Sequence, residues 1–404
     1  MSIIKRNTLA SYINDCVLGS YFQLPIWIVY QSQFLSYTQI ATFASLAILT
    51  EVFMQIPTGA FADIFGRRHS LALGNLFMAI PLFLLAIFPT PGIMPIYAIM
   101  WGSGRAFCMG TSKPILYETL TKYAFTAQYQ KILSNSLICF QLSAAISTIL
   151  GGYLYQIKPN LPYIVSGIVS LLGVFTAYLF IEDRDHSNFH LSHFVATIKG
   201  GIVAISDTSY MLRLTLLFCL TLGIAQAAQQ QLIQPYMLEL GMGDIARSWA
   251  AMIIKISIAF LGAKVISMSK IITHRYFLLL IPVIMILAFI PASFVTIPFA
   301  YLTFTLIAFN SGNIELFFSN EIQAHINSKT RSTSISLLRM FASIVGALTM
   351  YCSSVVVTHA SVGTYFSYLG YFALFVILPL AYLQSSHKHK TTQLDTTLRA
   401  SQLQ

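Results

Sequence analysis

Long apolar stretches separated by short polar ones recur along nearly the whole chain. A helix needs about 20 apolar residues to cross the hydrocarbon of a bilayer. Strands of a membrane barrel would alternate with polar residues and be about half as long, so stretches of this kind predict helices. The pattern predicts an all-α integral membrane protein with about twelve transmembrane helices. The expected spans are 9–30, 39–62, 69–89, 95–119, 131–155, 161–181, 209–233, 247–268, 275–293, 297–322, 332–357 and 363–384.

The longest polar connection divides these spans into two groups of six. Residues 182–208 collect charge, histidine and glycine and are expected to form a central cytoplasmic loop. We therefore expect one six-helix bundle over 1–181 and a second over 209–384, followed by a polar, disordered cytoplasmic tail over 385–404.

Weak internal similarity indicates that the two bundles are related by pseudo-symmetry. Gly59-Ala60 ends the second span, and Gly262-Ala263 ends the eighth. Such repeats, offset by about half of the chain, are typical of transporter halves.

Composition and charge agree with a membrane location and give the orientation. Only 9% of the residues are charged and 56% are hydrophobic, whereas a soluble domain carries about 25% charged residues. Most lysines and arginines fall on one side of the expected spans, and the opposite loops carry only Lys158 and Arg247. By the positive-inside rule both termini are cytoplasmic, and we expect a multi-pass protein of a bacterial cytoplasmic (inner) membrane. The net charge of +10 reflects this topology, so no nucleic-acid partner is expected.

A charged elbow, GAFADIFGRRHS at 59–70, connects the second and third spans. Its glycines, Gly59 and Gly66, are expected to let the backbone turn tightly and pack closely. Arg67 and Arg68 keep their charge and must lie at a water-facing end of the spans. The elbow therefore marks the cytoplasmic side.

With Pro57 and Thr58 just before it, the elbow resembles the loop between the second and third helices of the major facilitator superfamily of secondary transporters. The Pro25-Ile26-Trp27 run, IPTGAFAD at 56–63 and RSTSISL at 331–337 extend the resemblance, which covers residues 1 to 384. It implies two six-helix bundles that rock about a central site.

The resemblance also implies a conformational latch at the elbow. Asp63 would lie against the start of the eleventh helix near Ser332, and the arginines would reach Glu118 at the inner end of the fourth helix. An acid at a helix N-terminus and an Arg–Glu contact at the surface contribute ~1 kcal/mol each. Such weak contacts suit a latch that must break; the alternative is that the arginines only fix topology. The expected latch residues are Gly59, Asp63, Gly66, Arg67, Arg68, Glu118 and Ser332.

Ionisable residues inside spans are costly in lipid and are the first candidates for chemistry. Glu51 lies twelve residues before Asp63 of the elbow, and Arg105 lies thirteen residues before Glu118. At a rise of ~1.5 Å per residue, both are roughly 18–20 Å from the cytoplasmic end of their helices. In the family fold their helices are neighbours. Lys255 and Glu315 occupy the corresponding positions of the second half.

Two interpretations of these four residues stay open. A pair that forms and breaks during the cycle could load and release a proton. Alternatively, each pair only holds helices together. We weigh the two equally for Glu51–Arg105 and favour proton coupling for Glu315.

The resemblance places the substrate cavity between the first, fourth, seventh and tenth helices. Amides are costly against lipid, so a polar stripe on an apolar helix faces protein or water. The seventh span carries such a stripe, and smaller polar groups occur on the first and tenth spans, whereas Asp15 lies near enough to the cytoplasmic end to be solvated. The expected cavity residues are Gln23, Trp27, Gln226, Gln229, Gln230, Gln234, Asn310 and Asn313.

The expected function is secondary active transport of a small organic solute, driven by a proton gradient and requiring no cofactor or metal. We favour efflux, with uptake of a sugar, amino acid or other metabolite as the alternative. The antiporter-type signature of the fifth helix survives only as Ser-Thr-Ile-Leu-Gly-Gly at 147–152, without its proline, which leaves the direction open.

Other classes fit less well. The sequence contains no group of residues typical of a catalytic site, so an enzyme is not expected. A channel would not need two related halves. A sensor that has the transporter fold but transports nothing remains an alternative. The expected partners are the solute and the lipid bilayer, with the protein as a monomer.

Overall fold

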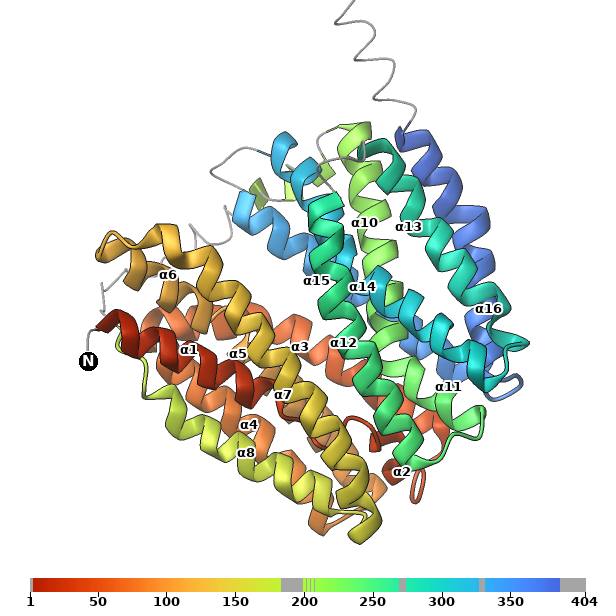
Figure 1. Ribbon diagram of the computed structural model, residues 1–404, viewed down its shortest axis with the longest axis horizontal. Helices are drawn as coiled ribbons and strands as arrows, with labels where there is room; N and C mark the ends of the chain where they lie inside the picture. The colour runs from red at the N-terminus through yellow and green to blue at the C-terminus, as the bar shows by residue number, and fades with distance from the viewer. Residues whose placement is uncertain are drawn as a thin grey trace, which may run out of the picture. The chain divides into compact units, whose positions relative to one another are not determined.

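The computed structural model describes residues 3–182, 199–200, 202–203, 205–206, 208–268, 274–326 and 331–385. Within these residues the chain forms helices, turns and loops and no strand. The helices pack as two compact units (Figure 1). The first unit joins residues 1–190 with 233–259 and 350–359, and the second joins 191–232, 260–349 and 360–404.

The first unit contains the helices of the first half of the chain. Helix α4 packs against both α5 and α8, and α1 packs along α7. The helices are α1 (Ile3–Gly19), α2 (Trp27–Gln31), α3 (Tyr37–Phe65), α4 (Arg67–Ile87), α5 (Met94–Cys108), α6 (Ser112–Lys122), α7 (Tyr129–Ile157), α8 (Leu161–Ala177) and α11 (Ile233–Glu239), with short turns η1 (Pro91–Ile93) and η2 (Thr126–Gln128).

The remaining helices belong wholly or mostly to the second unit, except α12, most of which (244–259) lies in the first; the last turns of α15 (350–356) also lie in the first. Helix α14 packs against α10 and α13. The helices are α10 (Ser209–Ala227), η3 (Ala228–Leu232), α12 (Asp244–Met268), α13 (His274–Phe289), η4 (Ile290–Ser293), α14 (Ile297–His325), α15 (Arg331–Val356), α16 (Val362–Phe372) and η5 (Ala373–Ile377).

Each of the twelve expected spans coincides with helical residues. Six helices of the described part are long and apolar enough to cross a membrane by length and composition, and three shorter apolar helices accompany them. The first and fourth expected spans are absent from these six because each is divided into two helices. How the chain divides at 182–208 stays a prediction, since most of that loop and all of 386–404 lie outside the described residues.

The first span is broken between α1 and α2, so the expectation of one helix over 9–30 is wrong. Residues 20–26 are not helical. Pro25 lacks a backbone N–H and disfavours helix at the residue before it. Neighbouring helices hold the break: the N–H of Phe22 donates to Ser166 Oγ (2.9 Å), and Gly151 of α7 lies so close that an added Cβ would be 1.9 Å from the Phe22 carbonyl oxygen.

The fourth span is broken as well, and the expectation of one helix over 95–119 is wrong. Helix α5 ends at Cys108 and α6 begins at Ser112. Gly110 between them has φ +71°, a left-handed conformation that favours glycine. Thr111 Oγ1 donates to the Cys108 carbonyl (2.8 Å), which satisfies one acceptor left free at the end of α5.

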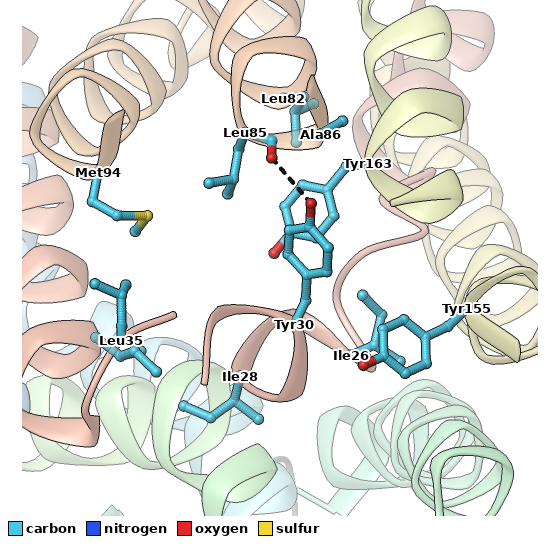
Figure 2. Close-up of a cluster of buried hydrophobic side chains, with 11 residues drawn as sticks. Ile26, Ile28, Tyr30, Leu35, Leu82, Leu85, Ala86, Met94, Tyr155 and Tyr163 are labelled. Atoms are coloured by element: carbon cyan, nitrogen blue, oxygen red, sulfur yellow. Dashed lines mark hydrogen bonds between the residues drawn. The ribbon is translucent and has the colours of Figure 1, made fainter. Parts of the chain in front are cut away.

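An aromatic core holds α2, the helix that follows the break in the first span. Figure 2 shows Tyr30 of α2 lying between α4 and α8, where its hydroxyl donates to the Leu85 carbonyl (3.1 Å). Its ring lies 4.6 Å from that of Tyr163 between centroids. Trp27, an expected cavity residue, is partly buried and packs against this cluster.

Candidate functional site

The elbow turns at Gly66 alone. Gly66 has φ 99° and ψ 144°, ends α3 and precedes α4. The expectation that Gly59 also turns and packs closely is wrong: Gly59 lies inside α3, and among the described residues no atom comes within 4 Å of an added Cβ. Helix α3 thus continues through residue 59 although Pro57 lies two residues before it.

Arg67 and Glu118 form the expected contact. Arg67 Nη1 lies 2.5 Å from Glu118 Oε1, with the two side chains 23% and 57% exposed. An ion pair this exposed contributes at most about 1 kcal/mol. Arg68 does not share the contact, and its buried Nε has no hydrogen-bond partner within the described residues.

Glu182 contacts the elbow and was not predicted from the sequence. Its carboxylate accepts from the backbone N–H groups of Arg67 (2.8 Å) and Arg68 (3.2 Å), so it caps the start of α4. The available signal was an acid directly after the sixth span. Asp63 is exposed in the first unit, and the side chain of Ser332 lies outside the described residues, so their contact stays a prediction.

Glu51 and Arg105 form an ion pair between α3 and α5. Arg105 Nε donates to Glu51 Oε2 at 2.8 Å. The arginine side chain is 39% exposed and the glutamate only 17%. The pair therefore has one buried and one accessible member.

Aromatic rings continue from this pair into the break of the first span. Trp101 lies one helical turn before Arg105, and its ring stacks on Tyr97 at 6.0 Å between centroids. Tyr21, inside the break, meets Trp101 edge to face at 5.2 Å. Gln23, also in the break, is 2% exposed, and its Oε1 has no partner within the described part of the chain.

A second ion pair joins α1 to α6 and was not predicted. Lys113 Nζ lies 2.5 Å from Asp15 Oδ2, with side chains 36% and 9% exposed. The expectation that Asp15 is solvated is wrong, because α6 covers it. Lys113 falls inside the expected fourth span, so the rule that an ionisable residue in a span indicates function would have found it.

The glutamines of the seventh span do not share one environment. In the second unit Gln226 is half-buried, Gln229 accepts a 2.5 Å hydrogen bond from Ser311 Oγ of α14, and Gln230 is exposed. Gln234, in the first unit, is 8% exposed and its Oε1 lacks a partner among the described residues. Gln229 and Gln230 lie within the π-helical turn η3, which departs from the 3.6-residue spacing on which the expected stripe rests, so a common cavity face for the four glutamines stays a prediction.

The tenth and eighth spans can be described only in part. Asn310 is 2% exposed and its Nδ2 donates weakly to the Ile281 carbonyl (3.4 Å), as expected of an amide between helices rather than on an open cavity wall. Lys255 is half-buried in α12. The side chains of Asn313 and Glu315 lie outside the described residues, so the expected Lys255–Glu315 pair stays a prediction.

The first unit thus places the Glu51–Arg105 ion pair near the aromatic rings and the broken first span, and a second ion pair, Asp15–Lys113, joins α1 to α6. Non-helical backbone at membrane depth is tolerated where protein or a water-filled cavity surrounds it, and broken helices of this kind form transport sites.

Comparison with known proteins agrees with this architecture. The family model of the Major Facilitator Superfamily matches residues 16–350. In Bacillus subtilis (strain 168), the uncharacterized MFS-type transporter YxaM is 21% identical over 226 residues, which is 54% of this chain and 55% of YxaM. Multidrug resistance protein 1 of the same strain is 23% identical over 198 residues, 47% of this chain and 48% of that protein. The chain thus matches about half of the length of these relatives.

Solved structures show the same fold at low sequence identity. The nucleoside transporter NupG aligns with TM-score 0.75 and 16% identity over 96% of this chain and 99% of its own. A D-xylose-proton symporter aligns with TM-score 0.70 and 12% identity over 94% and 99%. The expected fold class, an all-α integral membrane protein of this type, is confirmed. With the family model covering most of its length, the chain belongs to the major facilitator superfamily of membrane transporters.

Proposed function

We propose that this protein is a secondary active transporter that moves a small organic solute across the cytoplasmic membrane by alternating access, coupled to protons. It works as a monomer with both termini cytoplasmic and needs no cofactor. Membership of a transporter family and the multi-pass helical fold support the general activity.

The Glu51–Arg105 ion pair carries the proposal of proton coupling. Glu51 is 17% exposed, so its carboxylate depends on Arg105 for charge compensation. If a conformational step separates the two, burial favours the neutral carboxylic acid, and Glu51 takes a proton from water. When the pair forms again the proton is released. A proton is thereby tied to one state of the transporter.

The Arg67–Glu118 contact supports a role for the elbow as part of a latch. Its exposure makes it weak, and a latch that opens in every cycle must cost little to break. Asp63 and Ser332 would complete it.

One observation favours a direction of transport, and a second leaves it open. Similarity to a multidrug resistance protein favours efflux. The missing proline in the 147–152 stretch removes a feature of antiporters and leaves proton-coupled uptake as the alternative.

Purified protein in liposomes containing a pH-sensitive dye tests the proposal. A thermal-shift screen against metabolites and drugs first identifies a solute, because a ligand of the folded state raises its stability. An imposed gradient of that solute should then move protons, and dye signal lost on adding an uncoupler confirms the coupling. Solute movement with no proton movement would contradict the coupled mechanism.

A further inference from the structure

Two of the ion pairs found among the described residues of the first unit share an asymmetry. In Glu51–Arg105 and Asp15–Lys113 the base is the more accessible member, at 39% exposed against 17% and at 36% against 9%. In Arg67–Glu118 and Arg247–Asp244 the acid is the more exposed member. Both bases belong to the fourth span, on either side of its break, and both acids lie on neighbouring helices. The acids are thus covered while the cations remain open.

These accessible cations must border water. Lys113 lies nine residues before the end of α6, about 14 Å at 1.5 Å per residue, and Asp15 lies twelve residues after the start of α1. A charged group at such depth is not tolerated against hydrocarbon. A one-third exposed lysine there therefore faces water rather than lipid.

We propose that Lys113, held by Asp15, is a specificity residue that binds the carboxylate of a small organic acid. This inference rests on the proposed transport function and names its substrate class. An entering carboxylate replaces Asp15 as the partner of the ammonium group, which loses one ionic contact and gains another of the same kind.

Neighbouring groups fit such a solute. Asn14, next to Asp15 in α1, is 1% exposed, and its Nδ2 is a donor without a partner within the described residues. The rings of Tyr21, Tyr97 and Trp101 supply apolar surface near the other cation, Arg105. An aromatic acid is therefore a suitable probe of both cations, because it carries a carboxylate and a flat ring.

Three probes of nearly equal shape isolate the effect of charge: benzoate, benzamide and benzamidinium. Binding to the full-length protein in detergent is measured by thermal shift across a concentration series. We expect benzoate to stabilise the protein, benzamide to bind much more weakly and benzamidinium not to bind. Equal binding of all three, preference for benzamidinium, or no binding of benzoate would overturn the proposal.

Variants distinguish recognition from a purely structural ion pair. Lys113→Gln should weaken benzoate binding by about 10- to 100-fold, the loss expected for a charged hydrogen bond. Lys113→Arg should retain most of it. Asp15→Asn removes the internal competitor and should leave benzoate binding as tight as in the wild type or tighter.

A structural pair makes the opposite prediction for Asp15→Asn, because losing either partner would then impair the fold and binding alike. The double variant Asp15→Asn/Lys113→Gln leaves no unpaired charge, so it should fold and still fail to bind benzoate. Lys122→Gln, the same substitution at an exposed position of α6, is the matched control and should bind as the wild type does.

The outcomes separate this inference from the proposed function. Benzoate binding without solute-driven proton movement would keep the carboxylate site and contradict coupled transport. Coupled transport with no charge preference at Lys113 would contradict only the substrate class.

Discussion

At the scale of single residues, the residues in and around the elbow have different roles. Gly66 makes the turn, Glu182 caps the helix that follows, and Arg67 pairs with Glu118. Asp63 is exposed in its unit. Stability and conformational switching should therefore be separable by mutation.

Gly66→Ala should destabilise the protein by about 1–3 kcal/mol, because alanine is strained at φ 99°. Gly59→Ala is the matched control. It lies in a helix with open space around it and should be neutral or stabilise by up to about 1 kcal/mol. Thermal unfolding in detergent measures both, and equal losses would show that the turn does not depend on glycine.

Glu182→Ala removes the cap of α4 and should cost about 1 kcal/mol of stability. Asp63→Ala should leave the unfolding temperature unchanged and, if the latch exists, alter transport. A loss of stability in Asp63→Ala as large as that in Glu182→Ala would contradict this division of roles.

At the scale of helices, breaks divide the first and fourth expected spans into two helices each. Pro25 and Gly110 interrupt stretches that are otherwise apolar enough to be continuous. Each break lies near an ion pair and near the aromatic rings of Tyr21 and Trp101. The broken backbone of the first span depends on close packing by α7.

Gly151→Ala tests that packing. The added Cβ would lie 1.9 Å from the backbone oxygen of Phe22, which can move only if the break itself moves. We expect a loss of about 1–3 kcal/mol or failure to fold. Gly152→Ala is the matched neighbour: its added Cβ would lie 2.1 Å from the Oγ and 2.9 Å from the Cβ of Ser248, which belong to a side chain and not to the backbone, so the loss should be smaller. The reverse order in a thermal-unfolding assay would refute the role of Gly151.

At the scale of the whole molecule, hydropathy predicted the helices but not their continuity. Hydropathy counts apolar residues, whereas the break at 20–26 depends on Pro25 and on contacts from distant helices. The Glu51–Arg105 pair could be anticipated because the resemblance made their helices neighbours. Asp15–Lys113 was missed because distance from the helix end suggested solvent, and only the packing of α6 shows the burial.

The central claim is that a transporter of this fold couples solute movement to protons through Glu51. The most direct test is solute flux into liposomes at a series of pH values for the wild type and Glu51→Gln. Glutamine keeps the size of the side chain and can neither bind nor release a proton. The account predicts that the variant still exchanges solute down its gradient but loses the pH dependence and the proton-driven accumulation of the wild type. Unaltered pH dependence and accumulation in Glu51→Gln would contradict it.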